Sequence, residues 1–327
     1  MSISTNKAIH PASLRATLID LALTTRPKQW IKNFLVYLPL IFTVNHHWNV
    51  SEETSTLILL LRDTSFTFFA FTLASSAVYI WNDTCDRSAD TSHPKKKHRP
   101  IASGRLSLRV ALTFAVLLSV AALIIGLFVT IWIGAFIAGY LILMGFYSYY
   151  LKHLVILDVI VISSGYVARA VSGSIAIDAP VSAWLYVVTG LGALFLGFGK
   201  RKSELNKLEH PTTKPVGNNQ PLHSQRNVLS IYTHDLLNTL LSILVLSEIL
   251  SYLIYTFTAA NLPENNSMMA TIPFVIYGVF RYIVIVNEQT SPEQPEEALL
   301  SDRPVVATGI GWILTAITIL LMFPRGE

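Results

Sequence analysis

Charged residues are scarce in this chain: Asp, Glu, Lys and Arg make up 13% of its 327 residues, whereas hydrophobic residues make up 52%. The mean hydropathy is +0.50. A soluble domain of this size cannot bury so much apolar surface, so the composition excludes a soluble globular protein. A single cysteine, Cys85, excludes an internal disulfide. The first residues also lack the charged, apolar and small-residue pattern of a cleavable signal, and we expect the first apolar run itself to direct membrane insertion.

Apolar runs of bilayer-spanning length recur along the chain. A transmembrane helix needs about 20 predominantly apolar residues. We place nine such helices, at residues 33–49, 57–81, 107–127, 129–150, 154–177, 182–199, 235–257, 271–287 and 304–323. The predicted fold class is therefore all-α, a polytopic membrane bundle of nine transmembrane helices. We expect one transmembrane domain over residues 33–327, preceded by an amphipathic N-terminal arm at 1–32.

Lysine and arginine are missing from alternate connections between these runs. Residues 50–56, 178–181 and 258–270 contain neither. The basic residues gather instead in the N-terminal arm and in loops near 82–106 and 200–234. Because cytoplasmic loops retain Lys and Arg, we expect these three segments in the cytoplasm and the C-terminus outside. The net charge of +4 follows from this topology and gives no reason to invoke nucleic acid.

A short acidic segment directly follows the second apolar run. Asn82, Asp83, Asp86 and Asp90 lie within nine residues. If the helix continues, the three aspartates are spaced i, i+3 and i+7 and point along one face. Mg²⁺ takes a few carboxylates and shares its remaining coordination with water and phosphate oxygens. This face therefore suits a metal-diphosphate site at a membrane surface; a solvated acidic turn is the alternative interpretation.

A basic loop bounded by prolines comes next. Within it, Lys95 and Arg99 could neutralise phosphate oxygens bridged by Mg²⁺ on Asp83 and Asp86. The positive-inside rule and attraction to anionic lipid explain the loop's lysines equally well. They do not explain the acids beside them.

A second basic cluster ends the sixth apolar run on the same predicted side. Its members are Lys200, Arg201 and Glu204. A helix end that snorkels to the interface is the default interpretation; the alternative is that these side chains face the bundle mouth and hold an anionic substrate. Lys152, at the inner end of the fourth run, joins the same rim.

Four ionisable residues interrupt apolar runs, where a charge costs roughly 2.5 to 3.5 kcal/mol at a helix centre by insertion scales. They are Asp158, Arg169, Glu248 and Arg281. Mutual pairing that only holds the bundle together is one interpretation, and for Glu248 it is the preferred one. For Arg169 and Arg281 a substrate-binding role stands beside it, because a guanidinium fork suits phosphate as well as carboxylate.

Polar residues also lead into the first apolar run. Trp30 is typical of an interface anchor. Gln29, Lys32 and Asn33 could project into the same inner-side mouth.

Residues 82–104 resemble the first aspartate motif and following loop of the UbiA superfamily of intramembrane prenyltransferases. The resemblance implies nine helices around a central cavity with an inner-side polar cap. Typical members carry a second aspartate-rich motif where the sixth span ends, whereas residues 200–204 here read Lys-Arg-Lys-Ser-Glu. That departure resembles the polyprenyl (decaprenyl)-phosphate phosphoribosyltransferase subfamily. Residues 26–33, 199–205, 272–278, 280–282 and 302–304 carry the same resemblance.

The resemblance implies Mg²⁺-dependent transfer of 5-phosphoribosyl from 5-phosphoribosyl 1-diphosphate (PRPP) to a membrane polyprenyl phosphate, in the bacterial inner membrane with a cytoplasmic active site. Asp83, Asp86 and Asp90 would hold Mg²⁺, and Asn82 would help to orient the ligands. The residues expected to bind substrate are Gln29, Lys32, Asn33, Lys95, Arg99, Lys152, Asp158, Arg169, Lys200, Arg201, Glu204 and Arg281. Homo-oligomerisation is left open.

Two other functions remain as alternatives. An aromatic prenyltransferase would use the same aspartates on a prenyl diphosphate, but Glu204 would then have to replace a whole acidic motif. A transporter would use Asp158, Arg169 and Glu248 as a permeation path. The sequence shows no internal repeat of the kind that many transporters have.

Overall fold

The structure, a computed structural model, describes residues 14–49, 54–93, 95–209, 227–288 and 295–323. This part of the chain is helical and contains no named β-strand. Eight of its helices are long and apolar enough to cross a membrane. They are α3 (Thr54–Cys85), α5 (Leu108–Val129), α6 (Ile131–Tyr149), α7 (Leu157–Ala176), α8 (Ala183–Glu209), α9 (His234–Thr258), α10 (Ile272–Asn287, extended by the 3-10 turn η5, Ser267–Thr271) and α12 (Arg303–Met322).

Shorter elements connect these spans. They are the helices α1 (Leu14–Thr24), α2 (Leu38–Phe42), α4 (Arg87–Ser92) and α11 (Pro295–Ser301), and the 3-10 helices η1 (Pro27–Tyr37), η2 (Lys96–His98), η3 (Leu151–His153) and η4 (Asn227–Ser230). The first of these, α1, exposes Leu14, Leu18 and Leu23. Residues 1–13 of the predicted arm lie outside the described residues.

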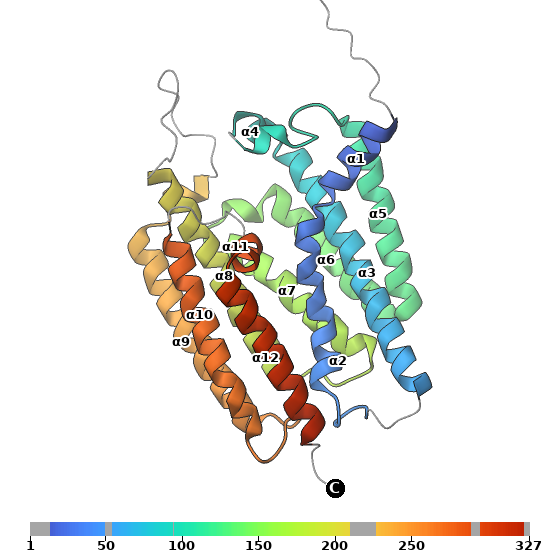
Figure 1. Cartoon of the computed structure of the whole chain (residues 1–327). Helices are drawn as coiled ribbons and strands as arrows, with labels where there is room; N and C mark the ends of the chain where they lie inside the picture. Colours follow the sequence, from blue (N-terminus) through green and yellow to red (C-terminus); the bar gives the residue numbers. More distant parts are fainter. Residues whose placement is uncertain (1–13, 50–53, 94, 210–226, 289–294, 324–327) are drawn as a thin grey trace, which may run out of the picture.

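The segment predicted as the first span, 33–49, is built differently from the others. The 3-10 helix η1 runs directly into α2, and a turn follows in which the Asn45 amide donates to the Trp48 carbonyl at 2.7 Å. In Figure 1 this blue segment passes from the end of the bundle that carries α4 to the end where α3 begins. Its helices are too short to count as a span of their own, so the predicted count of nine is not confirmed.

Close packing against α7 holds η1 in place. A Cβ on Gly173 would lie 2.1 Å from the Val36 carbonyl oxygen, so only glycine permits this approach. Val36 is fully buried. The contact explains how a segment with the buried polar side chains of Gln29 and Asn33 can pack inside an apolar bundle: it is fixed by its neighbour rather than by its own helical pattern.

The three basic segments share one end of the bundle. The chain passes α4 and the start of α5 at that end, and α8 and α10 also finish there, whereas α2 and the finish of α12 lie at the other end (Figure 1). This arrangement agrees with the predicted alternation of the loops. The bundle itself packs α3 against α5 and α6, and α8 against α7 and α9.

Two helices run further than predicted, and both extensions carry candidate site residues. α3 continues through Asp83 to Cys85, and α8 continues from the predicted boundary at residue 199 to Glu209. The second basic cluster therefore lies on a helix rather than in the expected loop at 200–234. Of that loop, residues 210–226 lie outside the described residues.

Candidate active site

The acidic segment keeps most of the helical geometry predicted for it. Asp86 breaks the helix for one residue and precedes α4. Even so, its amide donates to the Asn82 carbonyl at 2.9 Å, and the Asp90 amide donates to the Asp86 carbonyl at 2.8 Å, so the i to i−4 pattern continues. Asp83 and Asp90 are 3% and 4% exposed. Asp86 is half-buried, so the two outer carboxylates of the segment are enclosed and the middle one is partly accessible.

Cations from three other segments contact these carboxylates. Asp83 Oδ1 accepts hydrogen bonds from Arg26 Nη2 and, at 3.0 Å, from Arg99 Nη1. Arg99 Nη1 also donates to Asp90 Oδ2 at 2.7 Å. Their charges therefore balance inside a compact cluster. For Asp90, burial raises the carboxyl pKa above its ordinary value, while Arg99 acts in the opposite direction.

The remaining carboxylate of the segment has a partner of its own. Lys152 Nζ, on η3, donates to Asp86 Oδ1 at 2.5 Å. The other oxygen, Asp86 Oδ2, accepts from Asn82 Nδ2 at 3.0 Å. We call the three aspartates and their three cations the aspartate cluster; its members are Asp83, Asp86, Asp90, Arg26, Arg99 and Lys152.

The donor set of the aspartate cluster fits Mg²⁺ chemically. Carboxylate and amide oxygens are the ligands that this hard cation prefers. Asn82 Oδ1 is buried and has no hydrogen-bond partner within the described part of the chain, which leaves an oxygen available beside the carboxylates. The carboxylates are not gathered as a ready metal cage, since no group of three or more His, Cys, Asp or Glu among the described residues is arranged to hold a metal ion.

A cavity of about 150 Å³ adjoins the cluster. Several residues predicted from the sequence line it, namely Gln29, Lys32, Asn82, Arg169, Lys200 and Arg201. Tyrosines that the sequence analysis did not select line it too, namely Tyr79, Tyr140, Tyr147 and Tyr166. Lys32 Nζ lies 5.5 Å from the centroid of the Tyr166 ring. The cavity is thus bordered by cations and aromatic hydroxyls.

Arg169 is 4% exposed on α7, and its hydrogen-bond partners among the described residues are neutral. Its Nε donates to Asn33 Oδ1 at 2.6 Å, its Nη1 to the Gly165 carbonyl at 2.5 Å, and its Nη2 to the Tyr140 hydroxyl at 3.1 Å. Asn33 is oriented in turn by a 3.0 Å hydrogen bond to Thr72 Oγ1. These contacts fix the guanidinium without cancelling its positive charge.

Arg201, in contrast, is balanced by two acids. Its Nε donates to Asp158 Oδ2 at 2.7 Å and its Nη1 to Glu204 Oε2 at 2.5 Å. The Tyr232 hydroxyl donates to Asp158 Oδ1 at 2.8 Å, and burial raises the pKa of that hydroxyl. Asp158 is 0% and Arg201 2% exposed. We call these residues the buried network; its members are Asp158, Arg201, Glu204 and Tyr232.

Other predicted site residues lie elsewhere. Arg281 on α10 pairs with Asp302, the N-cap of α12, at 2.8 Å and does not line the cavity. Lys95 is exposed in the loop before η2. Glu248 is buried on α9, yet its Oε2 has no hydrogen-bond partner among the described residues, so the mutual pairing preferred for it is not found.

Arg26 is the main residue that the sequence analysis left out. It has a left-handed backbone (φ 52°, ψ 66°) directly before Pro27, and its guanidinium lies 5.0 Å from the centroid of the Tyr79 ring. No spacing rule links it to Asp83, because 57 residues separate the two. The tyrosines had a weak signal, since Tyr140 and Tyr147 lie seven residues apart on one face of α6.

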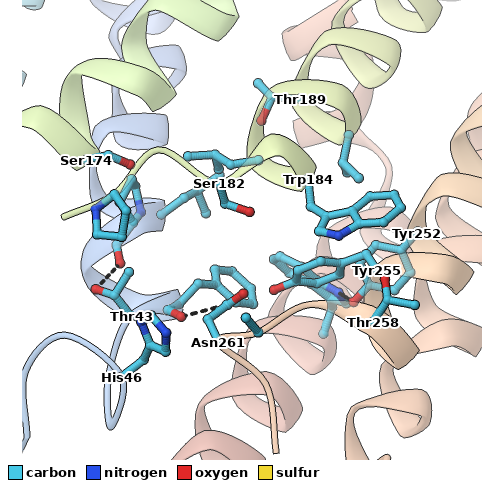
Figure 2. Close-up of a pocket in the computed structure, with 18 residues that line it drawn as sticks. Thr43, His46, Ser174, Ser182, Trp184, Thr189, Tyr252, Tyr255, Thr258 and Asn261 are labelled. Carbon is cyan, nitrogen blue, oxygen red and sulfur yellow. Dashed lines mark hydrogen bonds between the residues drawn. The ribbon is translucent and has the colours of Figure 1, made fainter.

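A larger cavity, of about 420 Å³, opens toward the opposite end of the bundle. Figure 2 shows its polar and aromatic lining, with Trp184, Tyr252 and Tyr255 around the space that Thr43 and Asn261 also border. None of the described residues that line it is Asp, Glu, Lys or Arg. Both cavities lie along α8, with Lys200 and Trp184 separated by about 24 Å at 1.5 Å per residue.

Comparisons with known proteins agree with this architecture. A sequence model of the UbiA prenyltransferase family matches residues 53–206. Over 93% of its length the chain is 32% identical to a decaprenyl-phosphate phosphoribosyltransferase from Mycolicibacterium smegmatis, of which it covers 92%. A protein of the same name from Corynebacterium glutamicum is 28% identical over 91% of this chain and 86% of its own length.

A solved structure shows the same fold. It is that of a UbiA homolog from Archaeoglobus fulgidus bound to DMAPP and Mg²⁺, with a TM-score of 0.62 and 16% sequence identity. The match covers 92% of this chain and 99% of that chain.

Proposed function

The chain belongs to the UbiA prenyltransferase family, in the subfamily of its relatives named decaprenyl-phosphate phosphoribosyltransferase, and on that premise we propose that it transfers 5-phosphoribosyl from PRPP to a membrane polyprenyl phosphate. Diphosphate is the second product, and the reaction requires Mg²⁺. The observation that carries the proposal is the cavity that Arg26 of the aspartate cluster lines together with Asn82 and with Arg169, whose described hydrogen-bond partners are neutral.

Asp83 and Asp86 would hold Mg²⁺ on the donor diphosphate, with Asp90 and Asn82 orienting ligands or water. The metal would supply charge stabilisation for the leaving diphosphate. Asn82 Oδ1 supports this assignment, because it is a buried oxygen that has no partner in the described part of the chain. Arg99, which contacts Asp83 and Asp90, lies within reach of the same phosphate oxygens.

Arg169 is the better candidate for binding a second anionic group. Its partners Asn33, Gly165 and Tyr140 are neutral, so its charge remains available to a phosphate. The charge of Arg201 is already balanced by Asp158 and Glu204. We therefore assign Arg169, together with Lys32 and Lys200 on the cavity wall, to the lipid phosphate or the ribose 5-phosphate.

These assignments account for the chemistry without a general base. C1 of the ribose passes through an oxocarbenium-like state as the bond to the diphosphate breaks. The incoming lipid phosphate is already an anionic oxygen nucleophile, so the protein has to position it and offset repulsion between two anions. Arg169 is suited to both tasks, because hydrogen bonds to Asn33 and Tyr140 fix its orientation.

The apolar tail of the acceptor would lie along the bundle toward the cavity of Figure 2. The absence of charged residues from the described lining of that cavity suits an isoprenoid chain. We infer that the opposite, aspartate-bearing end faces the cytoplasm, because the basic segments gather there and cytoplasmic loops retain Lys and Arg. A prenyl diphosphate donor is less well supported, because Glu204, the one acid in the second cluster, is engaged by Arg201.

The test is an assay with purified protein, Mg²⁺, labelled PRPP and a polyprenyl phosphate. We expect label to enter the lipid phase, and we expect Asp83→Asn and Asp86→Asn each to lower the rate by roughly 10²- to 10³-fold, as the loss of one electrostatic catalytic group does. Asp63→Asn is the matched control, since Asp63 lies on the same helix and, within the part of the chain that the structure describes, forms its ion pair with its neighbour Arg62. Consumption of a prenyl diphosphate without transfer of label would contradict the proposal.

A further inference from the structure

Every carboxylate of the acidic segment accepts a hydrogen bond from a cation. Asp83 Oδ1 contacts Arg26 and Arg99, Asp86 Oδ1 contacts Lys152, and Asp90 Oδ2 contacts Arg99. A divalent metal ion would compete with these cations for the negative charge of the carboxylates. A metal ion arriving by itself would bring two more positive charges to a cluster whose charges are already balanced, at a partly buried site.

A metal diphosphate presents a different balance. Its phosphate oxygens can accept the hydrogen bonds that the carboxylates give up, so the cations change partners and lose none of their pairing. Arg26 is placed for such an exchange, because it contacts Asp83 and also lines the cavity. Its side chain is 22% exposed, which leaves it room to turn toward a ligand.

The backbone of Arg26 supports this role independently. A non-glycine residue with φ 52° is uncommon, and the residue before a proline normally adopts an extended conformation. Such strained positions persist where the surrounding structure holds them and cluster at ligand-binding sites. Here the conformation places the guanidinium over the Tyr79 ring, between Asp83 and the cavity.

We propose that Arg26 and Lys152 are exchangeable counterions. Without ligand they neutralise Asp83 and Asp86, and when a metal diphosphate binds they pass to the diphosphate oxygens. Metal and diphosphate therefore bind with strong positive coupling. The inference rests on the proposed function only in taking a diphosphate as the ligand. It predicts that Mg²⁺ raises the affinity for diphosphate by the same factor by which diphosphate raises the affinity for Mg²⁺, because coupling between two ligands is reciprocal.

The experiment measures Mn²⁺ binding to the full chain in nanodiscs by electron paramagnetic resonance, at buffered free Mn²⁺, with and without inorganic diphosphate. For the wild-type protein we expect diphosphate to raise the Mn²⁺ affinity by a factor within the usual coupling range of roughly 5 to 150. For Arg26→Met we expect tighter binding of Mn²⁺ alone, since Asp83 loses a competing cation, and a coupling factor below that of the wild type. Lys152→Met should change both quantities in the same directions through Asp86.

Lys28→Met is the matched control. Lys28 lies two residues from Arg26, is 80% exposed and pairs with Glu297 on α11 at 3.5 Å, so this variant should keep the wild-type coupling. Arg26→Lys should restore part of it, because a cation is present again. The proposal is overturned if Arg26→Met and Lys152→Met bind Mn²⁺ alone more weakly than the wild type, or if both keep the full coupling factor.

These outcomes are separable from those of the transfer assay. Strong coupling with inorganic diphosphate but no transfer from PRPP would contradict the proposed function and leave the counterion exchange standing. Transfer from PRPP without coupling, in contrast, would remove the exchange and leave the function standing. If Arg26→Met does not fold, Lys152→Met carries the same test.

Discussion

The aspartate cluster and the buried network contain the same chemistry in two different settings. Both pair aspartates with cations at the same end of the bundle. In the aspartate cluster, Arg26 and Arg99 come from a 3-10 helix and a loop, and their side chains are 22% and 25% exposed. In the buried network, Arg201 and Asp158 come from two packed helices and are 2% and 0% exposed. The difference indicates that the pairs made by Arg26 and Arg99 can be exchanged and that the pair of Arg201 with Asp158 is fixed.

Solvent access explains this difference. A partly exposed ion pair contributes little to stability, because water or a ligand can replace either partner. Replacing a fully buried ion pair with apolar residues often costs no stability. Removing only one partner, however, leaves the other as a buried charge with neither water nor a counterion, which is strongly destabilising. Ion pairs that serve a ligand should therefore affect binding, whereas those of the buried network should affect folding.

The largest effect is expected from Arg201→Met. Loss of the guanidinium would leave Asp158 buried with only the Tyr232 hydroxyl as a partner, and breaking a buried pair in this way costs about 3–5 kcal/mol. Thermal unfolding in detergent, followed by a fluorescence or size-exclusion assay, measures the loss. The double variant Arg201→Met, Asp158→Asn should recover most of the stability because no buried charge remains. An unchanged melting temperature in the single variant would show that the network is exchangeable as well.

In contrast to Arg201→Met, Arg99→Met should weaken ligand binding much more than it lowers stability. Because Arg99 is 25% exposed, we expect a change in stability below about 1 kcal/mol. We expect diphosphate affinity to fall by about 1.5–3 kcal/mol, the usual value of a hydrogen bond to a charged group. Calorimetric titration with magnesium diphosphate, beside a melting curve, separates the two effects. A melting temperature lowered as far as that of Arg201→Met would contradict the comparison.

Gly173→Ala tests whether the aspartate cluster depends on packing elsewhere. A Cβ at this position would meet the Val36 carbonyl oxygen at 2.1 Å and push η1 away from α7. Such overpacking costs about 1–3 kcal/mol. It should also weaken diphosphate binding, because Arg26 lies at the start of η1. Gly139→Ala on α6 is the control, since a Cβ there has nothing within 4 Å.

The sequence predicts the aspartate face well because its information is local. Asp83, Asp86 and Asp90 are spaced for one helical face, and the continuing hydrogen bonds keep them on it. For the partners of these aspartates, the sequence predicts only that they are lysines or arginines, and not which ones they are. That Lys152 reaches Asp86 across 66 residues, and that Arg26 reaches Asp83 across 57, depends on how the helices pack.

The extension of α8 shows the same limit in the fold. Hydropathy ends the sixth span at residue 199, where Lys200 and Arg201 begin, because a lysine or arginine marks the membrane edge in a hydropathy scan. The helix nevertheless continues to Glu209, because Arg201 forms ion pairs with Asp158 on α7 and with Glu204 one turn further along α8. The segment at 33–49 deviates in the opposite direction: its apolar composition predicts one full helix, whereas the structure has the 3-10 helix η1, packed closely against Gly173, followed by the short helix α2.

The smallest effect concerns Arg281 and Asp302, an ion pair that resembles the aspartate cluster in exposure but borders neither cavity. The hydrogen bond from Arg281 lowers the pKa of Asp302 below its ordinary value of about 3.9. A carboxyl with a depressed pKa contributes stability that is present above that ordinary value and is lost as the pH falls through the folded-state pKa.

We therefore expect Asp302→Asn to lower the melting temperature slightly near neutral pH, and the difference from wild type to disappear in acid, below the ordinary carboxyl pKa of about 3.9. Asparagine can still cap α12 by accepting the hydrogen bond that the Val305 amide gives to Asp302, so the variant isolates the charge. Melting curves across this pH range are the measurement. Because neither residue borders a cavity, PRPP turnover should stay at the wild-type rate, and a fall in turnover would return Arg281 to the substrate-binding residues.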